Sequence, residues 1–161
     1  MKNFNSNTDN KDEWLTPPYI IEALGKFDLD PCAPIIRPWN MAQRHYNIND
    51  NGLTKEWAGR VWLNPPYGNN TFAWIEKLAI HKKGIALIFA RTETKGFHRQ
   101  IWEKAEAVFF FEGRLRFYHV NGTQGGTANA SSCLVCYSKE DANIIFWATM
   151  DNKIKGRFIQ L

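Results

Sequence analysis

The sequence predicts an α/β fold built around one mainly parallel sheet with an antiparallel end. Apolar segments of strand length alternate with segments of helical period between residues 60 and 105. Two further apolar segments, 108–111 and 113–117, follow each other with only a glycine turn between them, which indicates the antiparallel end. The 161 residues, 44% of them hydrophobic, suit one globular core. We therefore expect a single domain at 13–161 and, because residues 1–12 are polar and asparagine-rich, a flexible tail before it.

The first helix and the first strand are expected before residue 32. Thr16 and Pro17 form a helix-start pair, in which a side chain that can cap the first turn precedes a residue that needs no N–H there. Gly25 provides the stop. Residues 27–31 alternate in polarity and predict a short strand that ends in a turn carrying Asp30.

The centre of the chain changes from irregular to regular. Prolines, asparagines and a glycine interrupt any period over 33–58, so this region predicts a loop with room for a short strand at 46–48. The regular elements after this loop are a buried strand at 60–63, a helix at 71–83, a strand at 85–90, a helix at 96–105, and, after a polar glycine-rich stretch at 121–131, a last strand at 133–137.

The cysteines and histidines show no metal-site spacing. Three cysteines are an odd number, and Cys133 and Cys136 are spaced to point to opposite faces of a strand, so we expect neither a disulfide nor a bound metal. No stretch approaches the roughly 18 uninterrupted apolar residues of a membrane span, and the polar start lacks the apolar core of a secretion signal. We therefore expect a cytoplasmic protein with no membrane partner.

The charge is compatible with a phosphate-bearing partner. The formal net charge is +4 and the isoelectric point is near 9.0. Lysine and arginine gain affinity for nucleic acid by releasing condensed counterions. Many proteins without such a role are equally basic, so the charge supports a nucleic-acid partner only where another feature proposes one.

The most informative motif is Asn-Pro-Pro-Tyr at 64–67, directly after the strand predicted at 60–63. A residue before proline is held extended, and two prolines fix their own φ, so the segment forms a stiff ledge. Open α/β sheets bind their ligands beyond the carboxyl ends of strands, which is where this ledge lies. It presents the amide oxygen of Asn64, the carbonyl of Pro65, the ring of Pro66 and the aromatic face of Tyr67.

Such a ledge suits the methylation of an amine that is conjugated to an aromatic ring. Two acceptors that hold both amine hydrogens localise the nitrogen lone pair for in-line attack on a sulfonium methyl group. Tyr67 can stack on a base that has left the duplex, and stacking returns about 1 to 3 kcal/mol per base. The motif also occurs as a plain strand terminator, and its position after a buried strand favours the catalytic interpretation.

Several segments together resemble a known family. The runs EWLTPP (13–18), LGKFDLDPCA (24–33), DNGL (50–53) and RVWLNPPYG (60–68), with Trp57 among them, are similar in content and order to the phage-type DNA adenine N6-methyltransferases, a Dam-like family. The later run GRLRF (113–117) is similar to a further segment of that family. The resemblance implies a site-specific, adenine-specific DNA methyltransferase with a reduced Rossmann-like sheet, S-adenosylmethionine as co-substrate and no metal, acting on double-stranded DNA in a bacterial or phage-infected cell as a monomer or homodimer.

The resemblance also implies roles for individual residues. Those that the resemblance implies for cofactor binding are Trp14, Thr16, Pro17, Asp30 and Pro31. Asn64 is expected to take part as well, and Asp50 either binds a ribose hydroxyl or the adenine amine of the cofactor or is an ordinary loop residue. Asp30 would pair with the methionine ammonium, and the first N–H groups of the helix at Pro17 would face the carboxylate. The residues expected to contact DNA follow from position and charge, not from the resemblance. Arg91 follows a predicted strand end, Lys95, Arg114 and Arg116 are either phosphate contacts nearby or ordinary surface residues, and Phe117 either encloses the flipped base or lies in the core. No segment is large enough for a separate recognition domain, so target choice is assigned to the loop 121–131, with a short or relaxed site.

The chain departs from a full methyltransferase sheet in one respect. Asp30 and Asn64 lie only about 34 positions apart, which cannot hold two strands and their crossovers of a dozen or more residues each. The glycine-rich turn expected after Asp30 is replaced by Cys-Ala-Pro. The cofactor pocket must be reduced, completed by the loop 35–53, or completed by a second subunit.

Three other functions fit the same motif. A conjugated glutamine amide of a protein could be the methyl acceptor, and so could adenine in RNA. A non-catalytic nucleic-acid-binding module could also retain the fold, although such a module has no need to bind S-adenosylmethionine.

Overall fold

The computed structural model describes residues 13–161, and the tail expected at 1–12 lies outside these residues. The strands are β1 (Trp14–Leu15), β2 (Leu29–Asp30), β3 (Arg44–His45), β4 (Val61–Leu63), β5 (Gly84–Phe89), β6 (Ala107–Phe111), β7 (Arg116–His119), β8 (Gln124–Thr127), β9 (Ser132–Cys136) and β10 (Gly156–Gln160). The helices are α1 (Pro18–Leu24), α2 (Thr71–His81), α3 (Lys95–Phe97), which continues into a π-helical turn at His98–Trp102, and α4 (Lys139–Met150).

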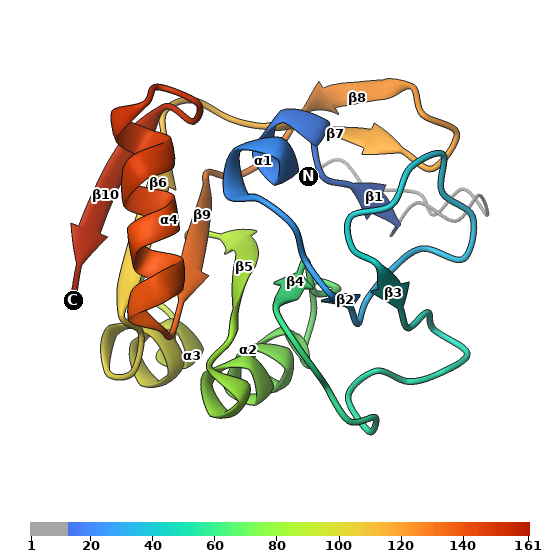
Figure 1. Cartoon of the computed structure of the whole chain (residues 1–161), viewed down its shortest axis with the longest axis horizontal. Coiled ribbons are helices and arrows are strands. Elements are labelled where there is room, and N and C mark those ends of the chain that lie inside the picture. Colours follow the sequence, from blue (N-terminus) through green and yellow to red (C-terminus); the bar gives the residue numbers. More distant parts are fainter. Residues whose placement is uncertain (1–12) are drawn as a thin grey trace, which may run out of the picture.

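Seven of these strands form one mixed sheet in the order β10-β6-β9-β5-β4-β2-β3. The neighbours from β3 to β5 are parallel, and those from β5 to β10 are antiparallel. The expected parallel part and antiparallel end are both present, but the prediction of a mainly parallel sheet was wrong, because three of the six strand pairs in this sheet of the described residues are antiparallel. The antiparallel part is wider than predicted, because β9 inserts between β5 and β6 and β10 extends the edge (Figure 1).

A second, three-stranded sheet has the order β1-β7-β8. The prediction that 113–117 adds to the main sheet was wrong. Gly113 adopts a φ of +73°, a turn conformation that glycine favours, and the chain then pairs Tyr118 with Leu15 instead of returning to β6. The stretch 121–131, expected to be irregular, contains β8.

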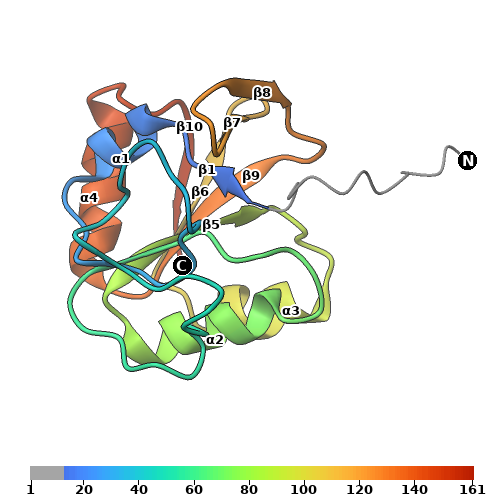
Figure 2. The ribbon, with the colours of Figure 1, turned by 90° about the vertical axis from the view of Figure 1, so that its right-hand side faces the viewer.

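The two faces of the main sheet carry separate hydrophobic cores. One core lies under α1 and α4 and includes Leu24, Trp62 and Ile145; the other lies under α2 and α3 and includes Leu63 and Phe97. Figure 2 shows the two helical layers on either side of the sheet. Cys136 belongs to the first core and Cys133 to the second, which confirms that they point to opposite faces.

The start of α1 differs from the expectation. Pro17 is the N-cap residue, and no side chain caps this helix, so the capping role predicted for Thr16 was wrong. Pro17 and Pro18 both lack an N–H, which leaves fewer donors in the first turn to cap. Thr16 is buried, and its hydroxyl has no partner among the described residues. The stop at Gly25 is confirmed by its φ of +88° and by its N–H, which donates to Ile21.

Two elements at the C-terminal end were not predicted. Ser138 caps α4 by accepting from the N–H of Asp141, and the Ser-x-x-Asp spacing is a helix-start signal that sequence reasoning missed. The chain then returns as β10, which pairs with β6 along five residues. The short strand expected at 46–48 lies instead at β3, two residues earlier.

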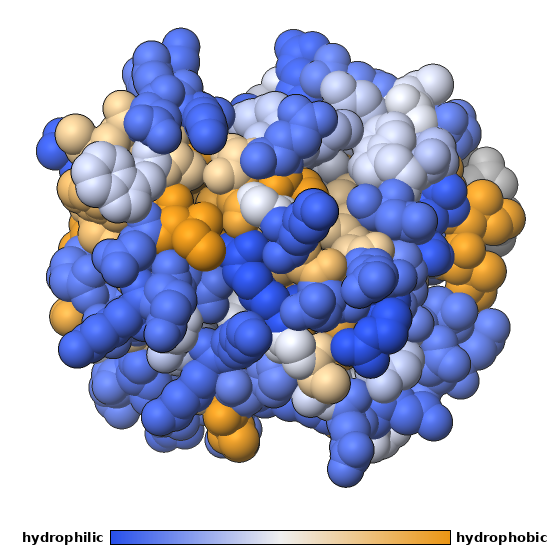
Figure 3. Space-filling view, in the orientation of Figure 1, coloured by the Kyte–Doolittle hydropathy of each residue, from blue (hydrophilic) through white to orange (hydrophobic). Residues whose placement is uncertain are grey.

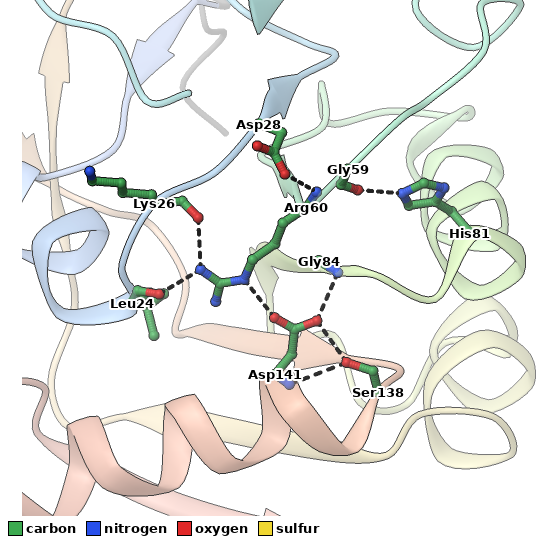
Figure 4. A network of polar contacts seen from close by, with 9 residues as sticks. All are labelled: Leu24, Lys26, Asp28, Gly59, Arg60, His81, Gly84, Ser138 and Asp141. Carbon is green, nitrogen blue, oxygen red and sulfur yellow. Dashed lines mark hydrogen bonds and ion pairs between the residues drawn. The ribbon is translucent and has the colours of Figure 1, made fainter. Parts of the chain in front are cut away.

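A polar clasp holds the amino end of β4, opposite the end that carries the ledge (Figure 4). The guanidinium of Arg60 donates from Nε to Asp141 Oδ1 at 2.8 Å and from Nη1 to the carbonyls of Leu24 and Lys26. Asp141 also accepts from the Gly84 N–H and from the Ser138 hydroxyl, both at 2.8 Å. The Arg60–Asp141 pair therefore ties β4, β5, α1 and α4 together.

Candidate functional site

A cavity of about 510 Å³ opens where three neighbouring parallel strands end. Pro31 follows β2, Asn64 follows β4, and Phe89 closes β5. The lining residues are Glu13, Trp14, Pro31, Cys32, Ala33, Pro34, Asn47, Ile48, Asn51, Gly52, Asn64, Pro65, Pro66, Tyr67, Trp74, Phe89, Phe117, Gly126, Thr127, Ala128 and Asn129. The carboxyl edge of the parallel strands is the place where open α/β sheets bind ligands.

All four residues of the ledge, 64–67, line this cavity. Thr71, in the first turn of α2, fixes the ledge from behind, because its hydroxyl donates to the Pro66 carbonyl at 2.8 Å and accepts from the Gly68 N–H at 3.0 Å. The ring of Tyr67 stacks on Phe89, with the centroids 4.2 Å apart and the planes 9° from parallel. Tyr67 nevertheless keeps 46% of its surface exposed, so one aromatic face remains accessible.

The wall facing the ledge comes from the small sheet. Trp14 of β1, Phe117 of β7 and the segment 126–129 all line the cavity. Gly125 makes room for the indole, since a Cβ there would lie 2.8 Å from the Trp14 ring. Arg114 donates to the carbonyls of Ala128 and Asn129, and so holds the end of this wall.

The loop between β3 and β4 completes the cavity. Residues 47, 48, 51 and 52, which belong to the loop 35–53 singled out in the sequence, line it. Gly52 packs directly on the chain at Pro31, where a Cβ would come within 2.2 Å of the Pro31 carbonyl oxygen. Lys77 reaches over from α2 and donates to the Leu53 carbonyl at 2.7 Å.

Two carboxylates that were expected to bind the cofactor have structural partners. Asp50 accepts from the Asn47 N–H at 2.8 Å and stabilises the turn of the loop. Asp30 is buried, and its Oδ1 accepts from the Cys32 N–H at 3.1 Å. Burial raises the pKa of Asp30 to about 7, although the Cys32 N–H and the charge of Arg37 oppose the shift. Neither carboxylate is among the residues that line the cavity.

The structure brings together part of the predicted site. Trp14, Pro31, the ledge 64–67 and Phe117 line the same cavity. The other predicted cofactor residues, Thr16, Pro17, Asp30 and Asp50, lie outside its lining, as do the four predicted DNA-binding cations Arg91, Lys95, Arg114 and Arg116, all of which are exposed.

Sequence reasoning missed several lining residues. Trp74 and Phe89 were not singled out, and Glu13 and residues 32–34 were noted only as parts of family-like runs or as the Cys-Ala-Pro turn, without a role in a site. Phe89 had a signal, because it ends the strand next to the one that carries the ledge, and parallel strands end at a common edge.

Two general features of the described residues bear on the chemistry. Within 13–161, no three histidine, cysteine or acidic side chains are grouped as metal ligands. None of the helices in this part of the chain has the length and hydrophobicity needed to cross a bilayer.

A mixed α/β sheet with a cavity at its carboxyl edge, lined by aromatic rings and by Asn64 and Pro65, has the architecture of the class of proteins that bind small organic ligands. The family model described as DNA N-6-adenine-methyltransferase (Dam) matches residues 4–156. The chain belongs to this family, and the resemblance found in the sequence is confirmed. Comparisons with curated proteins and with solved structures gave no match.

Proposed function

We propose that the protein transfers a methyl group from S-adenosylmethionine to the N6 amine of adenine in double-stranded DNA. Membership of the DNA adenine methyltransferase family supports the reaction class. The observation that carries the proposal is the position of residues 64–67, which face a ligand-sized cavity at the carboxyl edge of the sheet. The mixed sheet is consistent with a reduced Rossmann-like methyltransferase fold.

The cavity has properties that suit the cofactor. Its volume of about 510 Å³ falls in the range of about 300 to 1,000 Å³ that is usual for small-molecule sites. Trp14 offers an aromatic surface to the cofactor, and Gly52 keeps the loop close to Pro31. The approach of the methionine ammonium would lower the pKa of the buried Asp30, since an opposite charge favours the carboxylate. Thr16 and Pro17 would act indirectly, by holding Trp14 at the cavity.

The ledge would orient the amine of the target adenine. The amide oxygen of Asn64 and the carbonyl of Pro65 accept one N6 hydrogen each, which localises the nitrogen lone pair. The N6 nitrogen then forms a bond to the methyl carbon as the carbon–sulfur bond breaks. The electron pair of that bond stays on sulfur, giving S-adenosylhomocysteine, and the methylated amine releases one proton to solvent. The methyl transfer therefore needs no strong base.

Tyr67 would hold the extruded base. Phe89 covers one face of the Tyr67 ring and keeps its plane fixed, while the accessible face is available to stack on adenine. Stacking of about 1 to 3 kcal/mol offsets much of the few kcal/mol needed to unstack the base. Phe117, on the opposite wall, would enclose it.

DNA would approach the open side of the cavity. The exposed cations Arg91, Lys95 and Arg116 would contact phosphates, in keeping with the net charge of +4. Target choice would depend on the stretch 121–131, part of which forms the cavity wall. Exchanging that stretch for a glycine linker should change the site preference, and an unchanged preference would contradict this role. We further propose that the enzyme acts in the cytoplasm of a bacterial or phage-infected cell.

The decisive experiment is a product analysis. The protein is incubated with unmethylated DNA and labelled S-adenosylmethionine, and the DNA is then digested to nucleosides. Mass spectrometry should identify N6-methyl-2′-deoxyadenosine. Parallel incubations with RNA and with a glutamine-containing peptide test the other acceptors. Methylation of either in place of DNA would overturn the proposed substrate.

The matched variant is Asn64→Ala. It should lower the transfer rate by several orders of magnitude but leave cofactor affinity within about tenfold, because the lost acceptor acts mainly on the reacting amine. Calorimetry with S-adenosylmethionine provides the second readout. Wild-type turnover in this variant would remove Asn64 from the mechanism, and absence of cofactor binding in the wild type would favour a non-catalytic binding module.

A further inference from the structure

The strand β10 forms an edge of the main sheet, at the end farthest from β3 and the cavity (Figure 1). In the described part of the chain it pairs with β6 alone. Natural proteins usually shield such an edge, because its unpaired N–H and C=O groups can pair with another strand. Four of the five residues of β10 are exposed, so the edge is open to a partner.

The hydrogen-bond pattern identifies which groups face outward. The N–H of Glu112 donates to the Lys155 carbonyl, and the N–H of Leu161 donates to the Glu106 carbonyl. Opposite residues of an antiparallel pair alternate between bonded and non-bonded, so the odd-numbered residues of β10 bond to β6. Gly156, Phe158 and Gln160 therefore direct their backbone N–H and C=O groups away from the sheet.

Apolar side chains surround this edge. On α4, Trp147 and Met150 are 60% and 62% exposed, and Phe146, which packs edge-on against Phe158, is 37% exposed. Ile159 of β10 is also 37% exposed. Figure 3 shows hydrophobic surface over α4 and beside the C-terminal edge strand. Exposed apolar side chains next to an open strand are typical of a protein–protein contact.

We propose that β10 and α4 form a dimer interface with a second copy of this chain, in which the two β10 strands pair antiparallel about a twofold axis at Phe158. In this register Phe158 lies opposite its own copy, and Gly156 lies opposite Gln160. All three outward-facing residues then belong to bonded pairs, each of which exchanges two hydrogen bonds. Such a contact is isologous and closes at two copies.

The charges favour this register over its neighbour. Arg157 lies opposite Ile159 of the other copy, so no like charges meet directly across the strands. A register shifted to centre on Arg157 would place that guanidinium opposite its own copy. The Phe158 register also pairs all five residues of β10, whereas the shifted ones leave residues without a partner.

The position of α4 also favours a second copy of this chain as the partner of β10. A twofold axis between antiparallel strands is perpendicular to the sheet, so α4 of both copies lies on one face of the joined sheet. Phe146, which packs on Phe158 of β10, and Trp147, which packs on Phe146, then lose exposed apolar surface against the second copy, which favours association. A second copy thus satisfies both the strand edge and the apolar helix face. The interface does not depend on the proposed reaction, because the cavity lies beyond β4, away from this edge.

Light scattering across a dilution series tests the stoichiometry. The wild-type chain should show twice its monomer mass of 18.7 kDa and dissociate on dilution. Trp147→Lys should weaken dimerisation by about tenfold or more, as expected when a charge replaces a central aromatic anchor. The matched control is Ile80→Lys, which changes an apolar side chain on α2 that is 76% exposed and outside the interface. A mass of 18.7 kDa at every concentration would overturn the proposal.

A disulfide experiment tests the register. Arg157 and Ile159 of the other copy form a non-bonded pair, with Cα atoms about 4.5 Å apart, which is within disulfide range. Mild oxidation should therefore cross-link the variant carrying both Arg157→Cys and Ile159→Cys into covalent dimers. Arg157→Cys alone should stay uncross-linked, since its copy lies two residues away. If the protein is a dimer but the double variant does not cross-link, the interface lies elsewhere. This outcome can be read even if Trp147→Lys proves unstable.

Discussion

The clasp between Arg60 and Asp141 provides the most direct test of what holds β4 in the fold. Replacing Asp141 by alanine removes the carboxylate and leaves the guanidinium buried. The side chains of Arg60 and Asp141 are only 12% and 3% exposed, so water cannot replace the lost partner. The Gly84 N–H and the Ser138 hydroxyl lose the same acceptor. The substitution therefore removes contacts of β4, β5 and α4 at once.

The expected size of the effect can be worked out from these contacts. Breaking a buried ion pair by removing one partner costs about 3 to 5 kcal/mol, because the remaining charge is uncompensated. Domains of this size are usually stable by about 5 to 15 kcal/mol. The variant should thus lose a large fraction of its stability, with a decrease in melting temperature of about 6 to 20 °C.

Urea denaturation followed by circular dichroism measures the change. Asp141→Ala should unfold at a much lower urea concentration than the wild type, with a similar slope. Glu76→Ala is the control, because Glu76 is exposed on α2 and its removal should change the stability by no more than about 0.5 kcal/mol. A loss below about 1 kcal/mol in Asp141→Ala would show that the pair contributes as an exposed one does, and the explanation of the clasp would fail.

Three further predictions concern the cavity and two residues beside it. Tyr67→Ala should lower kcat/KM for DNA by about 10- to 100-fold with cofactor affinity retained, and Tyr67→Phe should keep most of the activity, because the ring does the stacking. Burial raises the pKa of Asp30 to about 7, so from about pH 4 to pH 7 the folded chain keeps a proton that the unfolded chain releases, and wild-type stability falls as the pH rises. In urea titrations Asp30→Asn should abolish this slope, worth about 4 kcal/mol in total, and a wild-type stability that rises over the same interval would contradict the shift. Arg114→Ala should speed hydrogen exchange at residues 127–129 and raise KM for DNA by about 2- to 10-fold, whereas Arg116→Ala should leave that exchange unchanged; equal exchange in both variants would argue against a positioning role for Arg114.

The ledge could be predicted because its signal is local. An apolar strand at 61–63 followed by Asn-Pro-Pro determines both the end of the strand and the stiffness of the segment after it. The alternation of strands and helices from β4 to β6 was likewise readable from short windows, and the structure confirms it.

The opposite wall of the cavity depends on contacts that no short window contains. Leu15 pairs with Tyr118, more than one hundred positions later, and the two-residue strand β1 is too short to show a period. The segment 113–117 has the alternation of a strand, but that alternation does not specify which sheet the strand joins. The loop over 47–52 has no periodic pattern at all, and its place is set by the close contact of Gly52 with Pro31.

The strand β4 is only three residues long, and all three of its side chains are fully buried. Arg60, the residue before this strand, is anchored by Asp141. The Asn64 amide, which follows the strand, is therefore held at a fixed position relative to the sheet. Under the proposed function, a nucleotide must therefore travel to the ledge rather than the reverse. The loops around the cavity would then adapt to different DNA sequences. The sequences of these loops could change while residues 64–67 keep their shape.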